Sequence, residues 1–137
     1  MPEALEVMAF DYGTRRIGIA IGNTLMQTAQ PLRVVSATNE TARFQAIDML
    51  LKEWQPQLLV VGLPYHPDGA EHEMTGRARR FGNQLNGRFK LPVEWVDERY
   101  TSVILEGDPD VRDNLDSESA CLILEQFFCE KAEKDRI

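Results

Sequence analysis

The sequence contains only two cysteines, Cys121 and Cys129, which lie eight residues apart in one apolar segment. Two cysteines are too few for a disulfide-stabilised scaffold or for a zinc site built on thiolates. No apolar run approaches the roughly 20 residues of a membrane-spanning helix, and the N-terminal segment lacks the basic residues typical of a signal peptide. We therefore expect a cytoplasmic protein that folds as a single domain over residues 1–137.

A positive net charge, the usual signature of a nucleic-acid-binding protein, is also absent. The formal net charge is −7, but residues 106–137 hold ten acids against four bases, so the rest is close to neutral. The stretch 74–93 contains five bases and no acid. Its Arg77 and Arg80 share one face of a predicted helix, where they form either a solvated surface or a nucleic-acid contact beside an acidic site. The net charge therefore does not exclude nucleic acid as a partner.

The hydrophobic pattern predicts strands at 5–10, 16–23, 31–37, 58–64 and 91–98. It predicts helices at 41–54, 71–86 and 115–134, and the start of a further helix at 99–107. Three meander strands followed by βαβ units indicate an α/β fold with a mixed five-stranded sheet flanked by helices. The residues expected to face the core are Phe44, Ile47, Leu50, Leu51 and Trp54 in the first helix, Met74, Ala78, Phe81 and Leu85 in the second, and Leu115, Ala120, Ile123, Leu124, Phe127 and Phe128 in the last.

Three acids occupy the ends of predicted elements. Asp11 ends the first strand region, Glu98 ends the last strand, and Asp116 starts the last helix. Carboxylates are the ligands that Mg²⁺ prefers, and two divalent ions about 3.5–4 Å apart assist phosphodiester hydrolysis. Without metal such carboxylates repel one another, and one takes up a proton. Periodicity alone does not select these acids, because each is also explained as a surface charge or, for Asp116, as a residue that stabilises the helix N-terminus.

The selection comes from a resemblance that extends from Met8 to Phe128. The segments FDYGTRRIGIAIGN, PL at 31–32, VVGLPYHPDG, RARRFGNQL, DERYTS and LDSESACLILEQFF occur in this order. Together they resemble the YqgF family, also called RuvX or Holliday-junction-resolvase-like, which has a ribonuclease H-like fold. The D-x-G-T motif alone is unspecific, since sugar kinases and actin-like ATPases share it. Its combination with V-G-L-P…D-G and D-E-R-x-T-S is specific.

The resemblance implies a metal-dependent nuclease that hydrolyses phosphodiester bonds in structured nucleic acid. The implied role is maturation of the 5′ end of the 16S ribosomal RNA precursor, with Holliday junction resolution as the older proposal. The implied partner is therefore pre-rRNA or branched DNA, with no membrane, and the chain is expected to be a monomer or a weak dimer. Asp11, Glu98 and Asp116 are the implied catalytic and metal-binding acids of a two-metal site for Mg²⁺ or Mn²⁺. Candidate nucleic-acid contacts are Thr14, Arg15, Arg16, Arg77, Arg80 and Arg99.

The sequence contains other potential metal ligands besides these acids. Asp97 is the nearest rival of Glu98, but adjacent residues of a strand point to opposite faces, so only one reaches a shared metal pair. The family match favours Glu98. His66 and His72 flank a Pro-Asp-Gly turn without the spacing of metal ligands, and both are expected at the surface.

The segment 103–115 departs from the family pattern. Family members commonly carry a longer, more basic segment between the D-E-R motif and the last aspartate. This segment is short and acidic, and Arg112 is its single basic residue. Either the loop is naturally trimmed or a flexible piece is missing from the sequence. The departure leaves Asp113 as an alternative to Asp116.

Two other functions stay open on the sequence. A non-catalytic, nucleic-acid-binding factor for ribosome assembly or regulation would carry the three acids as vestiges, and the short segment 103–115 favours this interpretation. A nucleotide-dependent kinase built on the D-x-G-T turn is disfavoured, because 137 residues leave no room for a second domain that closes over the nucleotide.

Overall fold

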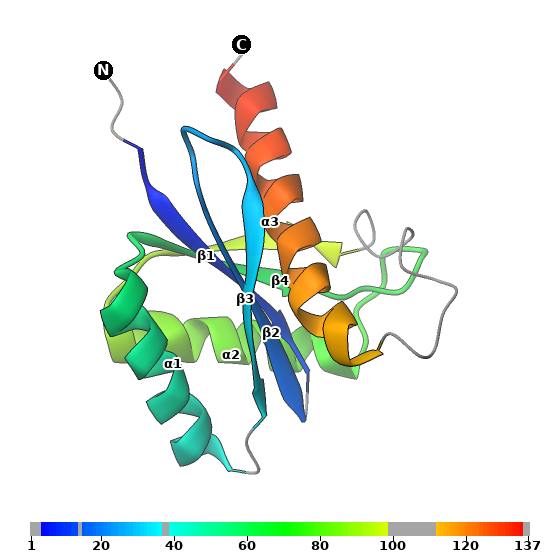
Figure 1. Ribbon diagram of the computed structural model, residues 1–137. Coiled ribbons are helices and arrows are strands. Elements are labelled where there is room, and N and C mark those ends of the chain that lie inside the picture. Colours follow the sequence, from blue (N-terminus) through cyan, green and yellow to red (C-terminus); the bar gives the residue numbers. More distant parts are fainter. Residues whose placement is uncertain (1–3, 14, 37–38, 99–111, 136–137) are drawn as a thin grey trace.

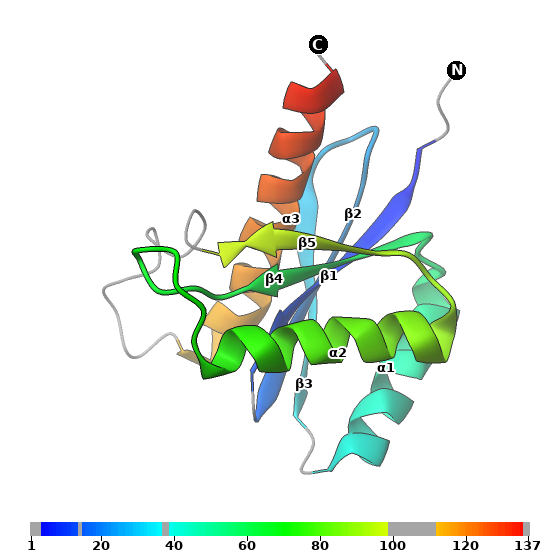
Figure 2. The ribbon, with the colours of Figure 1, turned by 180° about the vertical axis from the view of Figure 1, so that it is seen from behind.

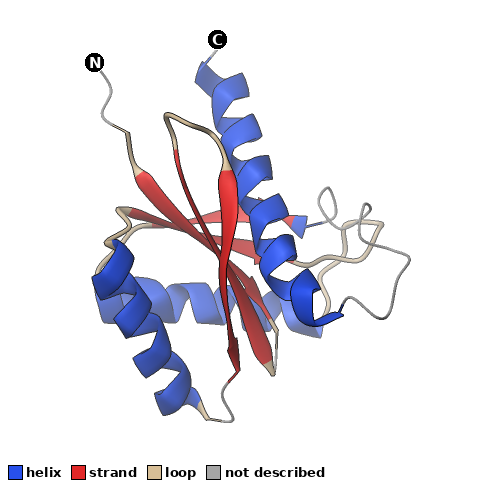
Figure 3. Cartoon of the chain, viewed as in Figure 1, coloured by secondary structure: helices blue, strands red, loops and turns tan. Residues whose placement is uncertain are grey.

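A computed structural model of the chain describes residues 4–13, 15–36, 39–98 and 112–135, with the side chains of the last helix described for 118–131. The described strands form one mixed sheet in the order β3-β2-β1-β4-β5, with helices on both faces (Figures 1 and 3). The predicted mixed five-stranded sheet is confirmed. The strands are β1 (Glu6–Tyr12), β2 (Arg16–Asn23), β3 (Ala29–Ser36), β4 (Leu58–Leu63) and β5 (Val93–Asp97), and the helices are α1 (Glu40–Trp54), α2 (Glu73–Phe89) and α3 (Arg112–Asp135).

The strand directions bring three carboxyl ends to one edge of the sheet. β1, β2 and β3 form the expected antiparallel meander, with an irregularity in the pairing between Ile19 and Ala20. β1, β4 and β5 run parallel, with Phe10 paired to Val61 and Leu63 paired to Asp97. Because parallel strands end on the same side, these three ends define what we call the carboxyl edge.

The two faces of the sheet carry different cores (Figures 1 and 2). α1 and α2 cover one side, which we call the aromatic face, where Phe10, Phe44 and Phe81 are buried together. α3 covers the other side, the α3 face, where Ala9 and Ile123 belong to a separate buried cluster. This division follows from the alternation of side chains along each strand, which sends neighbouring residues to opposite faces.

Local capping sets the helix boundaries. The Asn39 side chain accepts a hydrogen bond of 2.8 Å from the Ala42 N–H at the start of α1, and Gln55 ends that helix in the left-handed region with φ 49°. α2 begins at Glu73, two residues later than predicted, because the extended His72 caps it. It continues to Phe89, three residues past the predicted end.

Most of the predicted core is buried, with informative exceptions. The stripes of α1 and α2 are confirmed at Phe44, Ile47, Leu50 and Leu51 and at Ala78, Phe81 and Leu85, and five of the predicted α3 residues, Ala120, Ile123, Leu124, Phe127 and Phe128, are buried. The prediction is wrong for Trp54, which is 41% exposed as the last residue of α1, and Met74 in the first turn of α2 is only half-buried. Helical spacing predicts the side of a helix that packs, but not the point where the helix leaves the core. The Leu115 side chain and the predicted helix at 99–107 lie outside the described residues.

Candidate active site

The carboxyl edge brings together two of the three predicted acids, Asp11 and Glu98. β1 is longer than predicted and includes Asp11, which pairs with Gly18 of β2. Glu98 follows β5 directly, one residue beyond the pair of Leu63 and Asp97. The carboxyl groups of Asp11 and Glu98 share a hydrogen bond, although β4 lies between their strands.

Both acids lie on the α3 face. Asp11 follows the alternation that sends Ala9 to that face, and Glu98 follows the alternation of Val96, which belongs to the same buried cluster. The same alternation puts Asp97 on the opposite side of β5. The charge of Asp97 still contributes to the electrostatics of Glu98.

The environment of Glu98 disfavours its charged form. Burial raises the pKa of the Glu98 carboxyl to about 10, with further contributions from the charge of Asp11, the hydrogen bond to Asp11 and the charge of Asp97. Two hydrogen-bonded and partly desolvated carboxyl groups do not both ionise. Glu98 therefore stays protonated, and its O–H donates a hydrogen bond to the Asp11 carboxylate. A divalent cation removes this conflict, because it compensates both charges and takes hard oxygen ligands. The pair therefore fits a site for a divalent cation.

The third predicted acid, Asp116, lies in α3. It precedes the buried residues Ala120 and Ile123 by four and seven positions in the sequence of this helix. Asp113 lies in the same helix, three residues earlier. The side chains of Asp113 and Asp116 fall outside the described ones, and among the described residues no group of three or more His, Cys, Asp or Glu could hold a metal ion.

The predicted arginines that the structure describes lie in two places, at the carboxyl edge and on α2. Arg15 is exposed and Arg16 half-buried, immediately after the β1–β2 turn and therefore at the carboxyl edge with Asp11. Arg77 and Arg80 belong to α2, which packs on the aromatic face, so the structure does not bring them to the side of Asp11. The crossover between β4 and β5, which contains α2, passes over the aromatic face (Figure 2). Thr14 and Arg99 lie outside the described residues.

Acidic partners already hold part of the α2 arginine cluster. Arg77 pairs with Glu73 through Nη2 and Oε1 at 2.7 Å, and Arg79 pairs with Glu71. Arg80 is exposed and forms no ion pair with the described residues. The interpretation of this helix as a solvated surface thus accounts for Arg77, while Arg80 stays available.

Sequence reasoning missed the helix-capping role of His72. The Nδ1 atom of His72 accepts a hydrogen bond of 3.0 Å from the Met74 N–H, and the His72 N–H donates to Thr75 Oγ1 at 3.1 Å. Thr75 is fully buried, and its hydroxyl donates to the Pro64 carbonyl. His66 is exposed as expected, but its ring lies 4.9 Å from that of the half-buried His72. His72 and Thr75 have the three-residue spacing of a capping box but not its usual residue types, Ser or Thr followed by Glu or Gln, so the sequence carried no specific signal for this cap.

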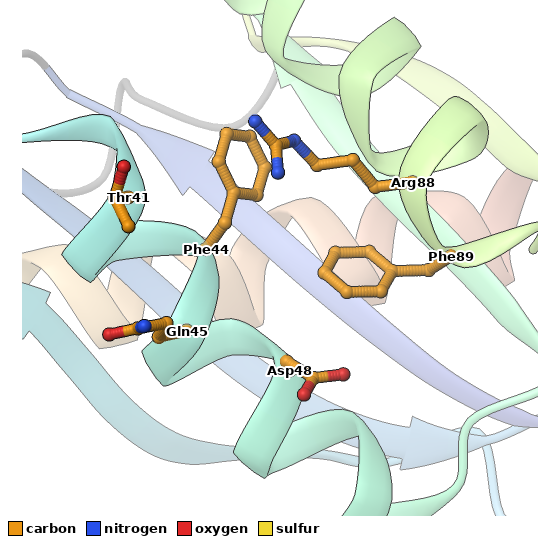
Figure 4. Close-up of a pocket in the computed structure, with 6 residues that line it drawn as sticks. All are labelled: Thr41, Phe44, Gln45, Asp48, Arg88 and Phe89. Atoms are coloured by element: carbon orange, nitrogen blue, oxygen red, sulfur yellow. The ribbon is translucent and has the colours of Figure 1, made fainter.

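A pocket between α1 and α2 lies away from the two acids. It encloses about 330 Å³ and is lined by Thr41, Phe44, Gln45, Asp48, Arg88 and Phe89 (Figure 4). The Arg88 guanidinium covers the Phe44 ring at 4.1 Å from its centroid. Asp48 pairs with Lys52 at 3.0 Å. With Phe44 and Phe89 in its wall, this pocket lies on the aromatic face and shares no residue with the acid pair.

Comparison with known proteins identifies the family. Residues 5–130 match the sequence model of RuvX, described as Holliday junction resolvase. This chain belongs to the RuvX family. It is 62% identical over 126 residues to a protein of Polynucleobacter necessarius subsp. necessarius named "Putative pre-16S rRNA nuclease", an alignment that covers 92% of this chain and 86% of the relative. A protein of the same name from Burkholderia mallei is 57% identical over 126 residues, with 89% and 86% covered.

Solved structures extend the comparison to the fold of this chain. RuvC of T. thermophilus in complex with a Holliday junction substrate superimposes with a TM-score of 0.60 at 16% identity, covering 94% of this chain and 96% of RuvC. A second Thermus thermophilus RuvC structure gives a TM-score of 0.56 at 14% identity, covering 94% and 97%. These likenesses confirm the ribonuclease H-like fold. No helix within the described ranges combines the length and apolarity needed to cross a membrane.

Proposed function

We propose that this chain is a metal-dependent nuclease that hydrolyses phosphodiester bonds of the 16S rRNA precursor. The observation that carries the proposal is the pair of Asp11 and Glu98, whose carboxyl groups meet at the carboxyl edge beneath α3. Membership in the RuvX family and the names of its relatives support nucleic acid as the substrate. We place this work in the cytoplasm, with the chain acting as a monomer or weak dimer.

Asp11, Glu98 and Asp116 are the residues that would hold two Mg²⁺ or Mn²⁺ ions. When bound, such ions supply Lewis-acid stabilisation of the attacking and the leaving oxygen of an in-line displacement. Asp11 pairs with Gly18 of β2, one residue beyond the last pair of β1 with β4, Phe10 and Val61. In its deprotonated form the Glu98 carboxylate would serve as a cation ligand rather than as a hydrogen-bond donor to Asp11. Asp116, in the first turns of α3, is proposed as the third ligand from its position in the sequence.

The phosphate contacts are proposed to come from residues at the carboxyl edge and from residues on α2. Arg15 and Arg16 follow Asp11 on the adjacent turn and offer positive charge to a phosphate near the acids. Thr14 of the same turn and Arg99, next to Glu98, are candidates on their sequence positions alone. Arg77 and Arg80 lie on α2 and would contact more distant parts of the substrate, where they contribute affinity rather than chemistry.

A second substrate is favoured by the description of the family as a Holliday junction resolvase. Cleavage of a four-way junction requires two cuts and therefore suits a dimer, whereas trimming of one RNA strand requires one copy of the site. The two substrates thus differ in the oligomeric state that they demand.

The decisive experiment compares wild-type protein with Asp11→Asn on a 5′-extended 16S rRNA fragment and on a four-way DNA junction. Each substrate is incubated with Mg²⁺, with Mn²⁺ and with a chelator. We expect cleavage of the RNA that requires the cation, and a loss in Asp11→Asn greater than the roughly 10–100-fold cost of removing a ligand's hydrogen-bond partner. RNA binding persists in Asp11→Asn, because the phosphate contacts are untouched.

Asp48→Asn is the matched control, since Asp48 is a surface acid paired with Lys52 on the aromatic side. It should keep wild-type cleavage. RNA binding by the wild type without any cleavage under either cation would favour the non-catalytic assembly factor instead. Cleavage of the junction alone would favour the second substrate.

A further inference from the structure

Gly62 occupies the position in β4 between the two acids. β4 is buried along its whole length, and Gly62 lies on the α3 face with Leu58 and Val60. Asp11 and Glu98 come from the neighbouring strands on either side of β4. A glycine within a strand costs stability, because it adds backbone entropy to the unfolded chain and packs no side chain. Its presence in an otherwise continuous apolar strand therefore requires a reason.

Backbone conformation does not supply that reason. Among the described glycines, Gly69 is the one with a positive φ, at 93°, so Gly62 has a backbone that other residues adopt freely. The space above Gly62 is what distinguishes it. A Cβ atom there would lie 2.8 Å from both Cγ and Oε1 of Glu98 and 2.5 Å from Cδ1 of Ile123. Such distances are essentially never seen for real Cβ atoms.

We propose that Gly62 is a positioning residue for the metal centre, because its missing side chain lets the Glu98 carboxyl cross β4 and reach Asp11. The inference rests on the proposed function. Glu98 emerges one residue after β5, and its Cγ and Oε1 atoms occupy the volume that any Cβ at position 62 would fill. Since a strand separates the two acids, a side chain at 62 forces Glu98 away from Asp11.

The test measures Mn²⁺ and Mg²⁺ affinity by titration calorimetry in wild-type protein and Gly62→Ala. We expect Gly62→Ala to weaken cation binding by about 10–100-fold, the usual cost of losing the group that orients a metal ligand. The rate of RNA cleavage should fall at low cation concentration and recover in part at high concentration, whereas KM for RNA should not change. Equal cation affinity in Gly62→Ala and wild type would overturn the inference.

Two other glycines provide matched controls. A Cβ at Gly76 would meet nothing within 4 Å, so Gly76→Ala should leave both stability and cation affinity unharmed. A Cβ at Gly82 would lie 2.4 and 2.5 Å from atoms of the Trp95 ring, on the aromatic face. Gly82→Ala therefore introduces a comparable clash away from the acids, and should lower the unfolding temperature while cation affinity in the folded protein stays unchanged. A loss of affinity in Gly82→Ala equal to that in Gly62→Ala would reduce the effect to general distortion.

A double-mutant cycle separates Glu98 from Ile123 as the cause. If Gly62 acts through Glu98, then Gly62→Ala has little further effect on cation affinity in a Glu98→Gln background, whereas independent effects add. Ile123→Val removes the clashing Cδ1 atom, so full recovery of affinity in Gly62→Ala/Ile123→Val would assign the effect to α3 packing and overturn the proposal. Absence of cation binding in the wild type itself would instead overturn the proposed function, which distinguishes the two failures.

Discussion

The two faces of the sheet differ in what their side chains do at the end of the same strand. Tyr12, the last residue of β1, turns to the aromatic face and packs its ring 5.0 Å from that of Phe81. Asp11, one residue earlier, turns to the α3 face and meets Glu98. The aromatic face is filled by large rings, with Phe10 and Phe44 at 5.8 and 6.0 Å from Phe81. A core-packing residue and an acid of the candidate site are therefore adjacent in the sequence.

The α3 face carries several small residues where the helix packs on the sheet. Ala9, Ala20 and Ala120 belong to its buried cluster, and α3 packs directly over Gly22 and Gly62 through Leu124 and Ile123. The rings of this face, Phe127 and Phe128, come from the later turns of α3. The comparison teaches that, where β1 ends, aromatic packing lies on one face of the sheet and the acid pair on the other.

The largest expected effect is a loss of stability from a substitution confined to the aromatic face. Phe81→Ala removes the ring that Phe10, Tyr12 and Phe44 all contact, and should lower the free energy of unfolding by about 3–5 kcal/mol. Denaturant unfolding measures this loss. Cation affinity and cleavage per folded molecule should stay at the wild-type level, measured well below the unfolding temperature. A matching loss of cation affinity would show that the two faces are not independent.

A smaller effect on stability is expected when Glu98, whose charged form is disfavoured by burial and by Asp11, is replaced. Because burial and Asp11 raise the pKa of Glu98 to about 10, the folded protein holds a proton that the unfolded chain releases above about 4.5. In metal-free protein, stability should therefore fall as pH rises through this window. Glu98→Gln cannot ionise, so it should flatten the profile and exceed the wild type by about 0.5–3 kcal/mol at slightly alkaline pH.

The measurement for Glu98→Gln is urea unfolding with a chelator present, from about pH 5 to about pH 9. Glu94→Gln, which changes an exposed acid of β5, is the control and should keep the wild-type slope. Added Mg²⁺ should stabilise the wild type more than Glu98→Gln. A wild-type stability that rises with pH in the metal-free protein would contradict the assigned environment of Glu98.

The smallest expected effect concerns RNA affinity and compares one arginine from each side. Arg15→Ala, at the carboxyl edge, should reduce the slope of log affinity against log salt by about 1, as for one lost phosphate contact. Arg80→Ala, on α2, should reduce it less, because that helix covers the other face. Arg79→Ala is the control, since Arg79 is held by Glu71. A larger effect of Arg80→Ala than of Arg15→Ala would move the substrate path to the aromatic side.

Local pattern predicted the elements better than their placement. Alternation and helical spacing predicted the meander, the buried strand β4 and the stripes that include Ile47, Phe81 and Ile123, because these patterns depend on neighbours in the sequence. The side of the sheet that α2 covers was not predictable in this way. It depends on how the crossover between β4 and β5 packs, so Arg80 lies away from Asp11 although the sequence suggested a shared site.

The sequence by itself determined which way each side chain faces, since the two-residue period of a strand sends Asp11 with Ala9 and Glu98 with Val96. Only the tertiary structure decided that Asp11 and Glu98, 87 positions apart, meet over Gly62. Periodicity is a property of adjacent residues, whereas the order β1-β4-β5 results from burying whole strands and helices together. The space above one glycine therefore has no signature in the sequence except the glycine itself.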